Sequence, residues 1–344
     1  MSCKNDCASL PSSIKAKPDI AGIGILLSFA LAAALTVFIA SFWWYIDLIE
    51  SAEKNRFSLG FFNGSFRDSL RAQATGWLSK DKRRRWARNT QQLILALSDQ
   101  QLATGVALLV ATQMRICKLT SYHYRTAVLL TFVPISVHCL AIRTLAPTVA
   151  IPRSFAMLVH AGLLIFGYVR VYSGGVGSVN GSQRADVRWP ISCTLPVDLQ
   201  ALKLSKTNWP ELGVGDSDRK VSTMFLSILI IMIVGNLTYT WRRLRKSDEQ
   251  SDSVMGKAED VFTSFFLNFA VAIASIIFSI ASVLKLRAQV RPYLESNEDD
   301  WSFGQIMAIL LLVVLLFLVL ESISDTSKAS SGNGRPETLS QSVE

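Results

Sequence analysis

Seven long apolar stretches, nearly free of charged residues, constrain this chain more than any other feature. A helix needs about 20 predominantly apolar residues to cross the hydrocarbon core of a bilayer. The stretches cover residues 20–46, 92–114, 126–142, 154–172, 221–241, 261–284 and 301–320. They predict an all-α fold, a polytopic transmembrane helix bundle of about seven spans, with six or eight as the alternative counts.

The composition supports this prediction. Only 18% of the 344 residues are charged and the mean hydropathy is +0.33, whereas a soluble domain carries about 25% charged residues. A soluble globular enzyme is therefore excluded. The net charge of +9 fits cationic cytoplasmic loops, so we expect the lipid bilayer as the partner and no nucleic acid.

The segments outside the apolar stretches are short and polar. The first stretch is too long for a cleavable signal, so it reads as a retained signal anchor after a polar N-terminus, 1–19. The loops 47–91 and 173–220 are near the lower limit for a hydrophobic core of their own, so no separate soluble domain is expected within 20–320. The Ser-rich tail, 321–344, is expected to be disordered.

Clusters of basic residues predict the orientation. One side of the predicted membrane holds 19 Lys and Arg residues, in 47–91, 143–153, 242–260 and 321–344, and the other holds 15. The two dense clusters, 80–88 and 241–246, lie on the first side, which predicts a cytoplasmic C-terminus and an N-terminus outside or in the lumen. Three acids after the first stretch favour the reverse locally: Asp47, Glu50 and Glu53. The expected location is an endomembrane or the plasma membrane.

The first basic cluster is also a candidate contact for anionic lipid headgroups, at about 1 kcal/mol per cation. The alternative is a topology signal and nothing more. Its basic residues are Lys80, Lys82, Arg83, Arg84, Arg85 and Arg88.

Four of the five cysteines fall on the predicted lumenal side, where disulfides form. We expect a bond between Cys117 and Cys193, with pairing to Cys3 or Cys7 as the alternatives. Cys139 lies inside the third stretch as a packing residue. Of the glycosylation sequons, the one at Asn180 is on the lumenal side, which predicts that a glycan, if present, is attached there.

The sequence contains few residues that could carry catalysis. Three histidines are too few for a membrane di-iron enzyme, and no H-E-x-x-H, G-x-S-x-G or Walker A motif occurs. We therefore expect no metal and no cofactor.

Polar residues inside the stretches are the remaining site candidates. A carboxylate in hydrocarbon costs several kcal/mol unless it is paired or hydrated, so Asp99 is a functional-site hypothesis, with His138 or Asn268 as its expected partner. The alternative is that Asp99 only reaches the headgroups. His138 and His160 could face each other, whereas Asn236 and Asn268 suit hydrogen bonds between helices.

Three motifs carry a resemblance: "PDIAGIGILLSF" from Pro18 to Phe29, "LSDQQLATGVALL" from Leu97 to Leu109, and "YHY" from Tyr122 to Tyr124. The chain resembles a large group of uncharacterised multi-pass membrane proteins of filamentous ascomycete fungi. The resemblance implies no chemistry. Some such proteins are encoded near secondary-metabolite genes, which implies, by association, an accessory role in a biosynthetic pathway.

The leading hypothesis is a non-enzymatic receptor-like, scaffold or accessory component. The alternative is a membrane-embedded enzyme, such as a terpenoid-type cyclase with Asp99 as the acid. However, cyclases of that kind use more than one acid, and only one lies within a stretch here. A transporter is the third possibility, although no pair of broken hydrophobic segments marks matching halves.

Overall fold

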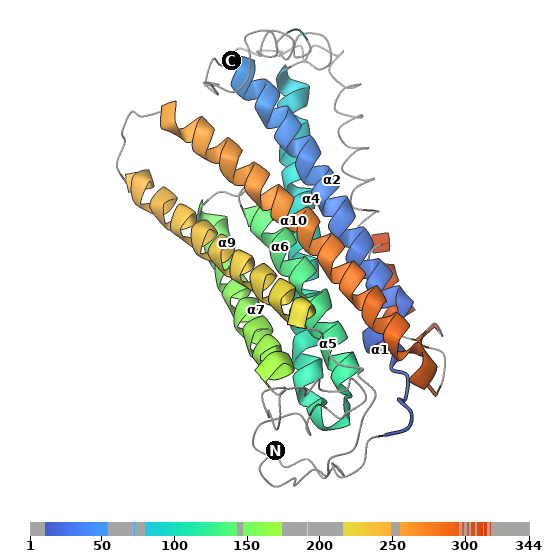
Figure 1. The fold of residues 1–344 in the computed structure, drawn as a ribbon. Coiled ribbons are helices and arrows are strands. Elements are labelled where there is room, and N and C mark those ends of the chain that lie inside the picture. Colours follow the sequence, from blue (N-terminus) through green and yellow to red (C-terminus); the bar gives the residue numbers. More distant parts are fainter. Residues whose placement is uncertain are drawn as a thin grey trace, which may run out of the picture.

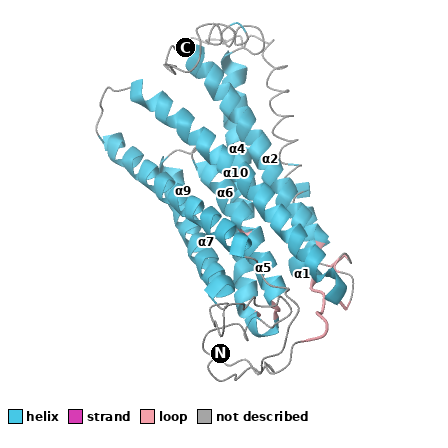
Figure 2. Cartoon of the chain, in the orientation of Figure 1, coloured by secondary structure: helices cyan, strands magenta, loops and turns pink. Residues whose placement is uncertain are grey.

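The computed structural model describes residues 11–53, 72, 80–142, 147–173, 191, 216–248, 255–295, 298 and parts of 301–317. All regular elements among these residues are helices (Figure 2), and an isolated β-bridge pairs Ile14 with Leu294. The predicted all-α bundle is thus confirmed.

The principal helices follow the predicted stretches in order. They are α1 (Pro18–Ala21), α2 (Ile23–Glu53), α4 (Lys80–Met114), α5 (Ser121–Leu130), α6 (Phe132–Ile142), α7 (Pro147–Ser173), α9 (Asp216–Asp248) and α10 (Met255–Val290). Taken as α1–α2, α4, α5–α6, α7, α9 and α10, they provide six segments long and apolar enough to cross a membrane. The seventh stretch is not among these six; its described residues between 304 and 317 are helical. It is called the last span, because the sequence predicts one there.

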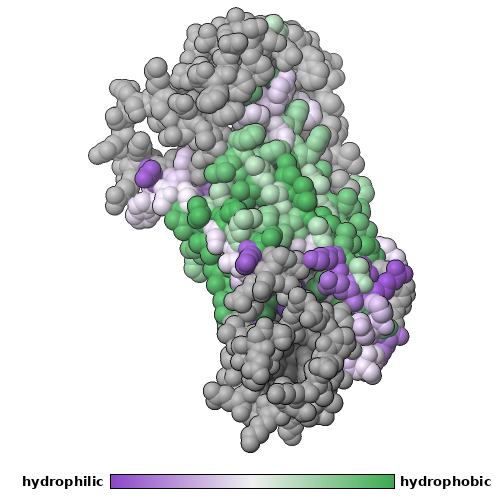
Figure 3. Space-filling view, in the orientation of Figure 1, coloured by the Kyte–Doolittle hydropathy of each residue, from purple (hydrophilic) through white to green (hydrophobic). Residues whose placement is uncertain are grey.

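Successive segments run in alternating directions. In Figure 1, α2, α5–α6 and α9 run toward the upper end of the bundle, while α4, α7 and α10 run back. On the face drawn in Figure 3, apolar side chains form a belt around the middle, with the most hydrophilic described side chains near its margins. Phe38, Phe155 and Ile231 are 71%, 69% and 69% exposed. Such exposure of large apolar side chains suits a surface covered by lipid tails.

The α5–α6 segment is the centre of the bundle. Every residue from Ser121 to Ile142 is buried, and α6 contacts α2, α4, α7, α9 and α10. The helix is interrupted at Thr131, three residues before Pro134, because proline lacks the N–H that would continue the helical hydrogen bonds. Since neighbouring helices cover all sides of this segment, it can hold polar residues that a lipid-facing span could not.

The four segments predicted on the lumenal side meet at one end of the bundle. Ile14 N–H donates to the Tyr293 carbonyl at 2.8 Å, and Ile191 N–H donates to the Leu119 carbonyl at 2.9 Å. The Lys17 ammonium also donates to the Lys118 carbonyl. Four loops that are far apart in sequence therefore share one end, as an alternating bundle requires.

The first basic cluster forms the beginning of α4. At 1.5 Å per residue, the 35 residues of α4 extend about 52 Å, more than the hydrocarbon core of about 30 Å. Its first turns therefore have length to extend beyond that core. There Trp86 packs edge-on against Phe42 of α2, with ring centroids 5.9 Å apart.

Candidate functional site

Asp99 on α4 forms an ion pair with Arg153 on α7. Nε of Arg153 lies 3.0 Å and 2.9 Å from the two carboxylate oxygens, and Nη2 lies 2.6 Å from Oδ2. The side chain of Asp99 is 37% exposed and that of Arg153 is 25% exposed. The planar guanidinium donates to both oxygens, so the contact fixes the orientation of the carboxylate as well as compensating its charge. The partner of Asp99 is thus Arg153, not His138 or Asn268.

Two buried histidines lie behind this ion pair. His138 on α6 experiences the charges of both Asp99 and Arg153, and it interacts in turn with His160 on α7. Both side chains are fully buried. His138 faces backbone groups of Ser98 and Arg153, and His160 faces a backbone group of Thr131. None of these contacts has the geometry of a full hydrogen bond. The structure therefore brings His138 to the ion pair and His160 to His138.

Gly105 allows α4 to approach these helices closely. A Cβ added at Gly105 would lie 2.6 Å from Cε1 of His160 and 3.1 Å from Cγ of Pro134. A larger residue would require the His160 ring, Pro134 or α4 itself to shift. The final glycine of "LSDQQLATG" therefore has a packing role in this cluster.

The two asparagines form a separate contact on the other side of α6. Nδ2 of Asn236 on α9 donates to Oδ1 of Asn268 on α10 at 3.1 Å and to the Cys139 carbonyl at 3.3 Å. Both asparagines are buried. They link α6, α9 and α10 and do not reach Asp99.

A third polar cluster joins the central segment to Glu298, in the loop before the last span. Glu298, 1% exposed, accepts hydrogen bonds from the Tyr122 hydroxyl at 2.5 Å and from His123 Nε2 at 3.1 Å. Arg287 Nε lies 4.0 Å from its carboxylate. Burial raises the pKa of Glu298, but the hydrogen bonds from His123 and Tyr122 and the nearby positive charges outweigh burial, so the pKa lies below its ordinary value of 4.5.

Gln305 in the last span bridges the break between α1 and α2. Its Nε2 donates to the Pro18 carbonyl at 3.1 Å, and its Oε1 accepts from the Gly24 N–H at 2.8 Å. The Gly24 N–H belongs to the first turn of α2, where backbone donors have no partner within the helix. The Asp19 carboxylate similarly accepts from the Gly304 N–H at 3.3 Å. The "PDIAGIG" motif thus forms the docking site for Gln305.

The cysteines are described only in part. Cys117 is disulfide-bonded and Cys139 is free and buried, whereas Cys3, Cys7 and Cys193 lie outside the described residues. The hydrogen bond from Ile191 to Leu119 pairs a residue two before Cys193 with a residue two after Cys117. The pairing Cys117–Cys193 stays a prediction, now with this contact in its support.

The remaining candidates are distributed as follows. Asn180 and the side chain of Lys80 lie outside the described residues. Lys82, Arg84 and Arg88 are exposed, Arg85 is half-buried, and Arg83 is buried. Arg83 therefore points its side chain into the protein, while three of the cluster's cations remain accessible to lipid headgroups.

Sequence reasoning missed Arg153, Glu298 and Gln305. A signal existed for each. Arg153 directly precedes the fourth stretch, at the same predicted membrane side as Asp99, and Gln305 is the one amide in the last stretch. An amide in an apolar span usually forms a hydrogen bond to another helix. Glu298 had the weakest signal, because it lies in a short acidic loop.

Comparison with known proteins finds a partial similarity to a fungal protein. The chain is 29% identical over 126 residues to an "Elsinochromes biosynthesis cluster protein HP3" of the filamentous ascomycete Elsinoe fawcettii. The match covers 37% of this chain and 45% of that protein, so it spans less than half of either. No protein-family model matches the chain, and no solved structure is significantly similar to it. The chain is thus similar, over part of its length, to a protein of a fungal biosynthetic cluster.

Proposed function

We propose that this chain is a non-enzymatic, accessory membrane protein of a fungal secondary-metabolite pathway. The observation that carries the proposal is the engagement of Asp99 by Arg153. A general acid must hold a proton and present it to a substrate, whereas this carboxylate accepts N–H donors on both oxygens. The similarity to a biosynthesis-cluster protein supports the pathway assignment.

The test is deletion of the gene in its host, followed by untargeted metabolite profiling and complementation. We expect the deletion to remove or accumulate a secondary metabolite and the wild-type gene to restore the profile. An unchanged profile under conditions that express the gene would refute the pathway role.

Complementation with variants separates an accessory role from catalysis. Asp99→Asn removes one charge of the pair, and Asp99→Asn with Arg153→Gln removes both. For an accessory protein, we expect the single variant to accumulate poorly and the double variant to recover both protein level and metabolite profile. A double variant that accumulates normally but does not restore the profile would favour an enzyme.

The histidines favour that second candidate, a membrane-embedded enzyme. Two buried imidazoles close to each other, one of them beside a charged pair, are groups that could transfer protons. His138→Gln and His160→Gln distinguish the candidates. An accessory role predicts complementation whenever the variants fold, whereas an enzyme predicts folded, inactive protein.

A further inference from the structure

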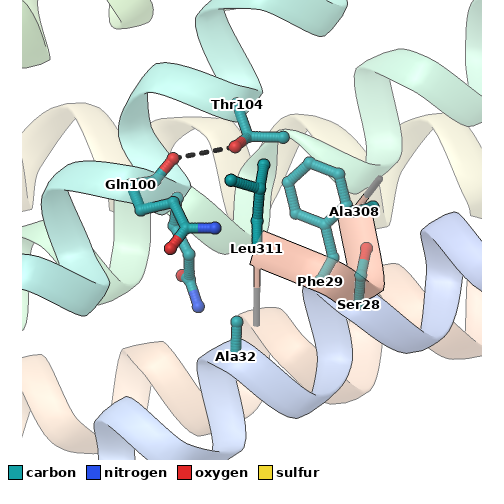
Figure 4. Close-up of a pocket in the computed structure, with 8 residues that line it drawn as sticks. Ser28, Phe29, Ala32, Gln100, Thr104, Ala308 and Leu311 are labelled. Carbon is teal, nitrogen blue, oxygen red and sulfur yellow. Dashed lines mark hydrogen bonds between the residues drawn. The ribbon is translucent and has the colours of Figure 1, made fainter. Parts of the chain in front are cut away.

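A small cavity lies between α2, α4 and the last span, apart from the ion pair. Its polar wall consists of Ser28 on α2 and of Gln100, Gln101 and Thr104 on α4, with Leu311 of the last span opposite (Figure 4). Its volume of ≈ 30 Å³ gives room for about two water-sized groups. Leu311 is 43% exposed, so the last span borders the cavity on the side of the lipid.

Gln101 is the unusual residue of this wall. It is only 3% exposed, yet neither its Nε2 nor its Oε1 has a hydrogen-bond partner among the described residues. Buried side-chain amides are almost always hydrogen-bonded, because leaving them unpaired forfeits the hydration they have in water. The amide therefore calls for a partner that this part of the chain does not provide.

The two hydroxyls of the wall are already engaged as donors. Ser28 donates its hydroxyl to the Ile25 carbonyl at 2.8 Å, and Thr104 donates to the Gln100 carbonyl at 2.8 Å (Figure 4). Their oxygens can still accept. The complement of this wall is a group that both accepts a hydrogen bond from Nε2 and donates one to Oε1, which is what a hydroxyl does.

We propose that Gln101 forms a hydroxyl-binding site within the apolar belt, occupied by water or by the hydroxyl end of a membrane-soluble alcohol or phenol. The volume beside Gln101 accepts the hydroxyl and the carbon that carries it. The rest of such a molecule lies along the lipid-facing side of α4 and the last span. Both occupants share the same chemistry at Gln101 and differ only in whether they enter from the bilayer.

A photoreactive diazirine analogue of 1-octanol tests the alcohol. The full-length protein is labelled in lipid nanodiscs and the adducts are mapped by mass spectrometry. We expect adducts within 100–104 and 308–311 that excess 1-octanol competes away and that Gln101→Leu reduces at least fivefold. Thr112→Val, an isosteric loss of a buried hydroxyl on the same helix outside the cavity, should leave labelling unchanged.

Radiolytic footprinting in H₂¹⁸O tests the water. A slowly exchanging bound water would leave ¹⁶O on Phe29 or Leu311 after brief mixing, and Gln101→Leu would abolish this signal. Either the competed adduct or the retained ¹⁶O, sensitive to Gln101→Leu, supports the site and identifies its occupant. Absence of both signals in folded protein, or signals that Gln101→Leu does not change, would overturn it.

Discussion

Replacing Gly24 by alanine should destabilise the attachment of the last span. A Cβ at this position would lie 2.5 Å from Oε1 and 2.7 Å from Cβ of Gln305, so the Gln305 side chain and its backbone must both move. The move breaks two hydrogen bonds made by a fully buried amide. Overpacking and a buried unpaired polar group each cost about 1–3 kcal/mol.

We therefore expect Gly24→Ala to lower the free energy of unfolding by about 2–4 kcal/mol, after a helix-propensity gain of at most about 1 kcal/mol. Matched controls are Gly162→Ala and Gly235→Ala, where an added Cβ meets no atom within 4 Å. They should be neutral or slightly stabilising. Reversible unfolding in mixed detergent micelles, followed by circular dichroism, provides the measurement.

A second substitution isolates the contact. Gln305→Gly alone should be costly, because it leaves the Gly24 N–H and the Pro18 carbonyl without their partner. In that background, Gly24→Ala has no Gln305 side chain to displace and should cost almost nothing more. Costs that simply add, or a Gly24→Ala variant as stable as the Gly162→Ala control, would refute the reasoning.

Three further predictions concern the ends of the bundle. Because the folded pKa of Glu298 lies below 4.5, its carboxylate stabilises the fold above that pH and loses this contribution as the pH falls through the folded pKa. The difference in free energy of unfolding between wild type and Glu298→Gln should therefore be constant from pH 6 to about 5 and shrink at lower pH. Unfolding measured at several pH values tests this. Non-reducing peptide mapping should find Cys117 joined to Cys193, and a Cys117 peptide linked elsewhere would exclude this pairing. If the chain is glycosylated, glycosidase shifts should depend on Asn180, whereas a glycan on Asn63 would reverse the predicted orientation.

The class of fold could be read from the sequence because lipid imposes a simple rule. Backbone groups in hydrocarbon must be hydrogen-bonded within the segment, so long apolar stretches without charges become helices whatever their neighbours are. The stretches 20–46 and 261–284 accordingly coincide with helices of the bundle. Residue type also marked Asp99, since a carboxylate in such a stretch needs compensation.

The sequence did not reveal which segment lies at the centre of the bundle. The stretch 126–142 is short, and polar residues precede it, which in isolation suggests a weak span. In the fold this segment is part of the centre, covered by five helices. Tyr122 and His123, just before it, bind Glu298, and His138 within it is a neighbour of the ion pair. Hydropathy cannot distinguish a span that inserts poorly from one that other helices cover on all sides, because both contain polar residues.

The partners of the polar residues were decided only by the tertiary structure. Arg153 reaches Asp99 because α4 and α7 place them at one depth and facing each other, and sequence fixes neither depth nor rotation. Gln305 and Gly24 are separated by 281 positions, yet the space left by one glycine is filled by that amide. Apolar content determines that a segment enters the membrane, whereas polar pairing depends on which helices become neighbours, and that follows from the packing of the whole bundle.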